Sequence, residues 1–347
     1  FFSFEKTMFL LLFGKIPTNF ELKMFNSTLK EYRTLPDEFI ENFILRQPSK
    51  DIMNQLQRTV LCLYTIDKNP DDTSLENLIN QALHLIAKFP SLLVYSYHAV
   101  NHKHFKQSFI IHNPVKEYSI AQNILHMLRP DSSFTDLEAE ILDLILLIHA
   151  EHGGGNNSTF TSHVVSSTGT DTYSSVSASI GSLKGPLHGG ANCMVSNMIE
   201  DIKKNCSYTN EEFLKEYIKK IFMGEAFDGS GKVYGMGHAI YTLSDPRAVI
   251  LKKKAYELAK EKGQLEEFEL FSNVEKFTKE IGKEIKGEGF EICANVDLYS
   301  GFVYKLLNIP TNIFTPLFAL ARIASWNAHR IEQITSDKKI IRPAYKA

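Results

Sequence analysis

Apolar side chains recur along this chain with the period of an α-helix, and this pattern restricts its fold more than any other feature. Apolar residues occupy the i, i+3, i+4 and i+7 positions over residues 75–86 and again over residues 213–222. The Thr-x-x-Glu sequences that begin at Thr18, Thr73 and Thr209 predict capping boxes at the N-termini of three helices. The sequence shows no run of short alternating strands, no tandem repeat and no low-complexity stretch. The chain is therefore predicted to be mainly α-helical.

Residues 157–183 are rich in Ser, Thr, Ala and Gly and contain few charges. Apolar residues from Phe160 to Ile180 lie at the spacing of a buried helix. Small side chains let a second backbone approach closely, so the segment is predicted to pack tightly against another helix or subunit. A flexible linker is the alternative interpretation of such a composition.

Residues 252–286 differ in composition, since they carry many Lys and Glu side chains. This composition predicts surface helices. The change from small and apolar to charged residues predicts a smaller, more exposed domain over residues 190–309. That domain would be inserted into a large domain formed by residues 1–189 and 310–347.

The bulk properties exclude some classes of partner. A formal net charge of -2 provides no overall basic field for nucleic acid or an anionic membrane. The apolar run from Met8 to Phe13 is far shorter than the ~20 residues of a membrane span and predicts a buried helix instead. The four cysteines are far apart, without a Cys-x-x-Cys pair, and predict reduced thiols in a reducing compartment.

Four polar motifs place histidine, asparagine or aspartate beside glycines or a turn. They are His152-Gly-Gly-Gly-Asn-Asn-Ser158, Gly185-Pro-Leu-His-Gly-Gly-Ala-Asn192, Gly235-Met-Gly-His238 followed by Asp245-Pro-Arg247, and Asn295-Val-Asp-Leu-Tyr-Ser-Gly301. A neutral imidazole can donate a hydrogen bond to a developing enolate, and a carboxylate can remove a proton. Arginine guanidinium groups match the geometry of substrate carboxylates. The motifs therefore indicate acid–base chemistry on a carbonyl compound.

Each of these residues, taken alone, has an ordinary structural explanation. A histidine after a turn, such as His188, is more often structural than catalytic. Asp297 could cap a helix as readily as it could remove a proton. The glycines around His238 could mark a turn, and a single arginine is usually solvated or paired at the surface. The combined spacing favours a shared site.

Together the four motifs resemble those of the citrate synthase family, whose members condense acetyl-CoA with oxaloacetate. The resemblance covers most of the chain. It implies a mainly α, two-domain fold, with a large helical domain, a smaller inserted helical domain and an active site in the cleft between them. It also implies an acyltransferase of the tricarboxylic acid cycle that converts the acyl group into an alkyl group on transfer.

The resemblance assigns roles to the catalytic candidates. Asp297 is the implied base that removes a methyl proton from acetyl-CoA. His188 is implied to donate to the thioester oxygen and to be oriented by Ser158, while His238 is implied to polarise the ketone of oxaloacetate. A helix that begins near Ala191 would disfavour the protonated form of His188.

The resemblance also implies a set of binding residues. The implied oxaloacetate ligands are His152, Asn156, Arg247, Arg322 and Arg342, and the segment beside CoA is Gly235, Met236 and Gly237. Arg342 is implied to reach the site of the neighbouring subunit, so the enzyme is expected to be a homodimer. Acetyl-CoA and oxaloacetate are the expected small-molecule partners, and neither a metal nor a cofactor is expected.

The chain departs from the family pattern at two places. Ala239 and Thr242 occupy positions where many members carry a basic residue, which leaves the contacts to the CoA phosphates open. The chain starts at Phe1 inside a helical pattern, and an N-terminal segment of the family fold is expected to be missing before it. The expected compartment is the cytoplasm in a bacterium or the mitochondrial matrix in a eukaryote.

Three alternatives to citrate synthase activity stay open. A 2-methylcitrate synthase would share these residues and accept propionyl-CoA. A catalytically silent paralogue would act as a helical scaffold or regulatory subunit. A metal-dependent hydrolase would use His149 and His152, although the glycines after His152 end such a helix and no third ligand is evident. His149 itself is predicted to be a core histidine.

Overall fold

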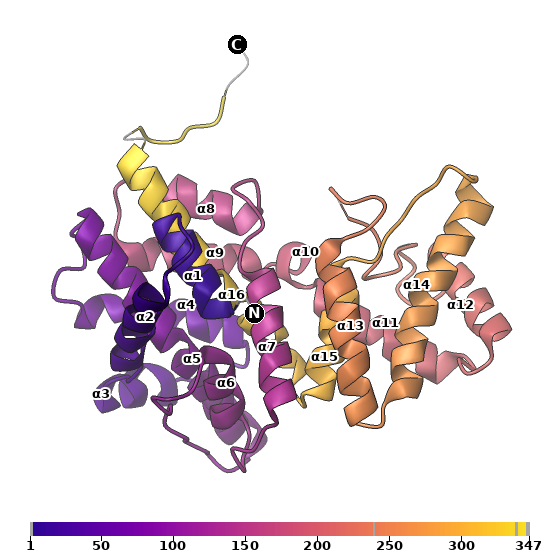
Figure 1. The fold of residues 1–347 in the computed structure, drawn as a ribbon, viewed down its shortest axis with the longest axis horizontal. Helices are drawn as coiled ribbons and strands as arrows, with labels where there is room; N and C mark the ends of the chain where they lie inside the picture. The colour runs from indigo at the N-terminus through magenta and orange to yellow at the C-terminus, as the bar shows by residue number, and fades with distance from the viewer. Residues whose placement is uncertain (1–2, 239, 337–338, 345–347) are drawn as a thin grey trace. The chain divides into compact units, whose positions relative to one another are not determined.

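The computed structural model describes residues 3–238, 240–336 and 339–344, so Phe1 and Ala239 lie outside the described residues. The chain divides into two compact units, Phe1–His188 with Thr315–Ala347, and Gly189–Phe314 (Figure 1). The predicted domain boundaries, 189/190 and 309/310, lie one and five residues from these limits. Within the described residues, regular structure is helical apart from one isolated antiparallel bridge between Met236 and Ala294, which confirms the mainly α fold class.

The first unit contains most of the helices. Its elements are α1 (Phe4–Phe13), α2 (Asn19–Tyr32), α3 (Asp37–Phe39), η1 (Ile40–Leu45), α4 (Ile52–Cys62), η2 (Leu63–Ile66), α5 (Leu75–Phe105), α6 (Ile120–Leu128), α7 (Asp136–His149), α8 (Asn157–Ser166), α9 (Thr172–Lys184), α10 (Pro186–Gly189) and α16 (Phe314–Ser336). The last two each have one terminal residue in the second unit.

Helix α5 forms the centre of the first unit. It is buried almost all round from Leu85 to Asn101, and it contacts α2, α4 and α6. A helix that is apolar on every side is stable only when other helices enclose it. This enclosure also accommodates Pro90, which lies inside the helix and lacks the N–H that would bond one turn back.

The Ser-rich segment forms two packed helices, α8 and α9, joined by a turn in which Gly169 has a φ of +78°. The small side chains do allow close contact: a Cβ on Gly181 of α9 would lie 2.6 Å from the Gln57 side chain of α4. Phe160 is 50% exposed in the single chain, so the prediction that it is buried against another helix of this chain is wrong, whereas a contact with another subunit stays a prediction. Phe160 lies on α8, whose buried face is formed instead by residues such as Ser158 and Ser162.

Helix α16, yellow in Figure 1, is tied to α8 and α9 by buried polar contacts. The guanidinium of Arg330 donates to Ser166 Oγ at 3.2 Å, to Thr172 Oγ1 at 3.1 Å and to the Thr170 carbonyl at 2.5 Å. A buried cation is tolerated only when its donors are satisfied. These bonds therefore fix the helix that carries Arg322.

The second unit is a smaller helical assembly. Its elements are α11 (Ala191–Asn205), α12 (Glu211–Met223), α13 (Pro246–Glu261), α14 (Leu265–Lys286), α15 (Val296–Leu306) and η3 (Thr311–Ile313). The charged segment forms α13 and α14, which bury apolar faces against α15 and expose their Lys and Glu side chains. A cluster of aromatic rings from α14 and α15, including Phe271 and Phe302, lies at the centre.

Only one of the three predicted capping boxes forms. Thr18 caps α2 and Glu21 bonds back to the Thr18 backbone. The boxes predicted at Thr73 and Thr209 are wrong, because α5 is capped by Ser74 and α12 by Asn210. Each of these residues lies one position later and is itself a strong N-cap, so its side chain takes the free N–H groups of the first turn.

Candidate functional site

The segment that carries His152 follows the end of α7 and is held by Glu151. The Glu151 carboxylate accepts the backbone N–H of His152 at 2.8 Å and that of Gly153, which has a φ of +83°. His329 Nε2, 3.1 Å away, and the Ser325 hydroxyl donate to the same carboxylate. Burial acts to raise the pKa of Glu151, but these bonds outweigh it and lower the pKa to about 2.

Ser158 and His188 meet within the first unit, as the resemblance implies. The Ser158 hydroxyl lies 3.0 Å from His188 Nε2, and the Ser158 backbone N–H donates to the same ring nitrogen at 3.3 Å. Ser158 Oγ also accepts the indole N–H of Trp326 at 3.3 Å, and Asn156 Oδ1, 2.9 Å away, shares the single hydroxyl proton with His188 Nε2. The first turn of α8 therefore presents both a backbone donor and a fixed hydroxyl to His188.

These contacts define the state of the His188 ring. A backbone N–H can only donate, so Nε2 is an acceptor and the proton of the neutral ring is on Nδ1. Burial lowers the pKa of His188, and the positive charge of Arg322 lowers it further. The first unit thus holds His188 as a neutral imidazole protonated on Nδ1.

The two arginines predicted in the first unit have different surroundings. Arg322 on α16 is 1% exposed, its Nε donates to the His149 carbonyl at 2.5 Å and its guanidinium lies over the Phe318 ring. Arg342 is exposed and lies in the extended segment after α16, next to Ile341, whose N–H donates to Ser167. Arg322 is therefore held firmly by its own chain, whereas Arg342 is presented at the surface.

In the second unit, the glycine-rich segment before His238 pairs with the segment before α15. Gly237 N–H donates to the Cys293 carbonyl at 2.7 Å, Asn295 N–H donates to the Gly235 carbonyl at 2.9 Å, and the Asn295 side chain donates to the Gly237 carbonyl. Gly235 has a φ of +84°, and a Cβ there would lie 2.8 Å from Leu298. This pairing fixes His238 relative to the N-terminus of α15.

His238 lies against Arg247 and Asp245. The backbone N–H groups of Ile240 and Tyr241 donate to His238 Nδ1 at 3.0 and 3.1 Å, so the proton of the neutral ring is on Nε2. Nε2 lies 3.1 Å from Arg247 Nη2, which is also a donor. Two donors so close together suit one shared oxygen acceptor.

Asp245 fixes the position of Arg247. Its buried carboxylate accepts Arg247 Nε at 3.0 Å and Nη2 at 2.8 Å, and it also caps α13. Burial acts to raise the pKa of Asp245, but the bonds and charge of Arg247 outweigh it and lower the pKa. Burial, followed by the Arg247 charge, lowers the pKa of His238.

Asp297 lies in the first turn of α15 but does not cap it. Asn295 is the N-cap, and its side chain accepts the N–H of Asp297 at 3.0 Å. The interpretation of Asp297 as a simple helix cap is therefore wrong. Asp297 thus lies at the positive end of the helix dipole of α15.

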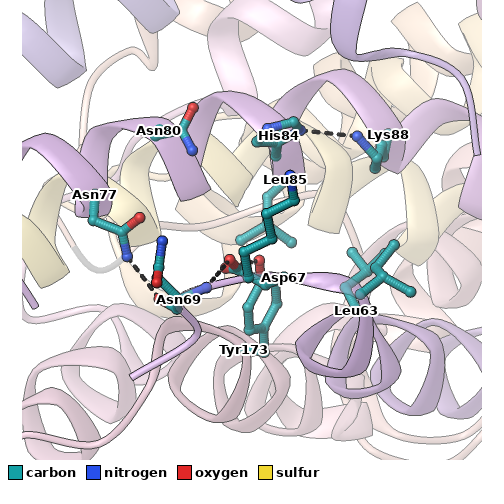
Figure 2. Close-up of a pocket in the computed structure, with 11 residues that line it drawn as sticks. Leu63, Asp67, Asn69, Asn77, Asn80, His84, Leu85, Lys88 and Tyr173 are labelled. Atoms are coloured by element: carbon teal, nitrogen blue, oxygen red, sulfur yellow. Dashed lines mark hydrogen bonds between the residues drawn. The ribbon is translucent and has the colours of Figure 1, made fainter. Parts of the chain in front are cut away.

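A separate cavity of about 380 Å³ lies in the first unit and contains none of the predicted site residues (Figure 2). Lys88, on α5, donates to the Tyr32 carbonyl at 2.8 Å and lies 2.9 Å from His84 Nδ1. Burial lowers the pKa of Lys88 to about 8, and burial together with the Lys88 charge lowers the pKa of His84 to about 4. Across the cavity, Asp67 accepts the hydroxyl of Tyr173 at 2.7 Å.

Among the described residues, His149 and His152 do not belong to a group of three side chains that could hold a metal ion. His149 is buried, as predicted, and its Nδ1 donates to the Ile145 carbonyl at 2.8 Å. Within the described part of the chain, the one group of three side chains suited to a metal ion is His163, His329 and Glu332.

The sequence interpretation missed four side chains that hold the predicted residues in place, namely Glu151, Asp245, Trp326 and His329. Asp245 had a usable signal, since an Asp directly before Pro is a common helix start and Arg247 follows two residues later. Trp326 and His329 contact residues more than 160 positions away, which no local pattern reveals.

The predicted residues thus form two sets, one in each unit. The first unit contains His152, Asn156, Ser158, His188, Arg322 and Arg342, and the second contains Gly235, Met236, Gly237, His238, Arg247 and Asp297.

In the described residues, no helix is long and apolar enough to cross a membrane.

Comparisons with known proteins show the family of this chain. The family model for the citrate synthase C-terminal domain matches residues 2–344. Citrate synthase of Synechocystis sp. is 35% identical over 347 residues, covering 98% of this chain and 80% of the relative. A 2-methylcitrate synthase of Shewanella oneidensis is 31% identical over 342 residues, covering 99% and 83%. The crystal structure of citrate synthase from Pyrobaculum aerophilum superposes with a TM-score of 0.82 at 28% identity, covering 99% of this chain and 82% of that one.

Proposed function

This chain belongs to the citrate synthase family, and on that premise we propose that it condenses acetyl-CoA with oxaloacetate and hydrolyses the resulting citryl-CoA to citrate and CoA. The observation that carries the proposal is a pair of histidines, His188 and His238, whose hydrogen bonds define the tautomer of each neutral ring. Burial and the charge of Arg322 lower the pKa of His188, and burial and the charge of Arg247 lower the pKa of His238. The family model and the relatives confirm the resemblance that the sequence suggested at the level of the family.

His188 stabilises the enol of acetyl-CoA in this proposal. A neutral imidazole protonated on Nδ1 can donate to the thioester oxygen as negative charge develops there. The lowered pKa of His188 supports this role, because the ring stays neutral at pH values at which an ordinary histidine begins to take up a second proton. The N–H and hydroxyl of Ser158 keep the ring oriented.

His238 and Arg247 bind and polarise the ketone of oxaloacetate. Their Nε2 and Nη2 donors are 3.1 Å apart and can converge on one oxygen, which makes the carbonyl carbon more electrophilic. Asp245 holds Arg247 in place for this contact.

Asp297 removes the methyl proton of acetyl-CoA. Asn295 caps α15 in place of Asp297, and a carboxylate can act as the general base for this proton. Water then attacks citryl-CoA and releases CoA.

The remaining binding residues recognise the carboxylates of oxaloacetate. His152, Asn156 and Arg322 act from the same chain, and Arg342 acts on the site of a neighbouring subunit, so that the enzyme is a homodimer. The exposure of Arg342 supports a role outside its own chain. Gly235, Met236 and Gly237 lie beside CoA, where glycines let a ligand approach the backbone.

A second candidate activity is 2-methylcitrate synthesis from propionyl-CoA. The Shewanella oneidensis relative favours it, since its identity to this chain is only slightly lower than that of the citrate synthase from Synechocystis sp.. Discrimination by one methylene is worth only ~1–3 kcal/mol in a pocket, so one chain can have both activities.

The experiment supplies oxaloacetate with acetyl-CoA or propionyl-CoA and identifies the product by mass spectrometry. Citrate in excess over 2-methylcitrate at equal acyl-CoA concentration supports the proposal. A preference for propionyl-CoA would assign 2-methylcitrate synthesis instead. Binding of oxaloacetate without any product would identify a catalytically silent paralogue.

A further inference from the structure

We propose that His163, His329 and Glu332 form a binding site for a divalent transition-metal ion of the zinc type. His163 lies on α8, and His329 and Glu332 are one turn apart on α16. One ligand atom from each side chain lies within 4.8 Å of the other two. None of the three belongs to the residues that the proposed condensation uses, so the two proposals stand or fall separately.

The distances between the ligand atoms suit one tetrahedral ion. His163 Nε2 lies 3.0 Å from His329 Nδ1, and the same His329 nitrogen lies 3.6 Å from Glu332 Oε2. Two donors bound to Zn²⁺ at ~2.05 Å with tetrahedral angles lie about 3.3 Å apart. These two separations bracket this value, and the ligand atoms of His163 and Glu332 lie within 4.8 Å of each other, so side-chain rotations can bring all three atoms onto one ion.

The outer nitrogens of both rings already have acceptors. His329 Nε2 donates to the Glu151 carboxylate at 3.1 Å, and His163 Nδ1 donates to Gln333 Oε1 at 2.9 Å. A histidine that binds a metal characteristically donates its other ring N–H to a carboxylate or carbonyl, which orients the ring and increases its basicity. Both histidines meet this condition.

The ring nitrogens that face each other can accept a cation between them. Two neutral imidazoles carry two protons, and the bonds to Glu151 and Gln333 use both of them. His163 Nε2 and His329 Nδ1 then face each other at 3.0 Å with lone pairs only. With the Gln333 amide in this orientation, a third proton or a metal ion satisfies the two nitrogens, and Glu332 supplies the third ligand that a metal requires.

The site is open to solvent on one side, because the Glu332 side chain is 67% exposed whereas that of His329 is 17% exposed. An ion can therefore enter from solution, and water can complete its coordination. The preference of imidazole with carboxylate is for Zn²⁺ and similar first-row ions rather than for Mg²⁺ or Ca²⁺.

The test titrates Zn²⁺ into the full-length, chelator-treated protein by calorimetry and Co²⁺ by visible spectroscopy, without substrates. We expect one ion per chain, proton release on binding and the d–d absorption of four-coordinate Co²⁺. His163→Gln and Glu332→Gln should each weaken binding at least tenfold, and Glu151→Gln should weaken it 10–100-fold through loss of the carboxylate charge next to His329. His102→Gln, at an exposed histidine on α5, is the matched control and should bind like the wild type.

Two results would contradict the proposed metal site. Zn²⁺ that binds with the same affinity to the His163→Gln, Glu332→Gln and wild-type proteins would place the ion elsewhere, for example on a free cysteine. Absence of stoichiometric binding to a wild-type protein with native circular dichroism would show that a proton, not a metal, lies between the rings. Either result overturns the proposal.

Discussion

The indole N–H of Trp326 donates to the hydroxyl of Ser158 at 3.3 Å, and it thereby joins α16 to the serine that contacts His188. Trp326 is the sole tryptophan in the sequence and is fully buried. Because Ser158 Oγ can rotate about its Cα–Cβ bond, a fixed donor on one side determines which way it faces the imidazole.

Trp326→Phe should lower kcat about three- to tenfold. The variant keeps an aromatic ring and removes the N–H donor, a loss of about 1 kcal/mol for one hydrogen bond. Because the donor acts on the orientation of His188, the pH profile of kcat should shift as well. The control is Trp326→Tyr, which places a different donor on the ring. Wild-type kcat and an unchanged pH profile in Trp326→Phe would show that Ser158 is oriented without the indole.

Asp245→Asn should raise the KM for oxaloacetate at least tenfold and change stability little. Asparagine caps a helix as well as aspartate does, so α13 keeps its N-terminus. The paired bond to Arg247 is lost, however, and the guanidinium is no longer held beside His238. Steady-state kinetics of this variant should be compared with Glu257→Gln, which changes an exposed carboxylate on the same helix. Equal KM values in both variants would contradict the role of Asp245.

Gly235→Ala should destabilise the second unit strongly. The backbone of Gly235 has a φ of +84°, and the added Cβ would lie 2.8–2.9 Å from Leu298. We expect a loss of about 2–4 kcal/mol in unfolding free energy, by denaturant titration. Gly263→Ala is the matched control, since Gly263 has a φ of +66° but open space around its Cβ position, and it should cost about 1 kcal/mol. Equal losses in the two variants would rule out the close contact with Leu298.

Lys88 should make stability depend on pH above 8. Its pKa is about 8 in the folded chain, against an ordinary lysine value of 10.5, so the unfolded chain binds more protons between these limits. Unfolding free energy therefore rises with pH across this window, by up to about 3 kcal/mol relative to Lys88→Met. Below pH 8 the lysine is protonated in both states, and the difference between the two proteins should be constant. A difference that stays constant from pH 8 to 10.5 would contradict the buried, lowered pKa.

The helical fold and the order of the motifs could be predicted from the sequence, because periodicity and glycine placement are local properties. The break between α8 and α9 could also have been found, since Gly169 lies where the chain needs a positive φ. The exposure of Phe160 could not, because it depends on which face of α8 meets α9 and α16. Neither could the cap positions of α5 and α12, where two adjacent residues compete for the same N–H groups.

The site was predictable only as far as the motifs extend. Asp297, His188 and His238 stand in segments with a recognisable pattern, whereas the residues that orient them are distant in sequence. The contact between His163 and His329 joins residues 166 positions apart, and Glu151 and His329 are 178 apart. Such pairs are determined by helix packing, so they become visible only once α16 is placed against α8.

The central claim is that Asp297 is the base of a condensation between acetyl-CoA and oxaloacetate. The most direct test compares the release of CoA thiol by the wild type and Asp297→Asn, with oxaloacetate binding to both measured by calorimetry. We predict that release by the wild type requires both substrates, and that the variant binds oxaloacetate normally but turns over ~10²–10⁴-fold more slowly. A variant that releases CoA at nearly the wild-type rate would contradict the assignment of Asp297 and, with it, the mechanism proposed for this chain.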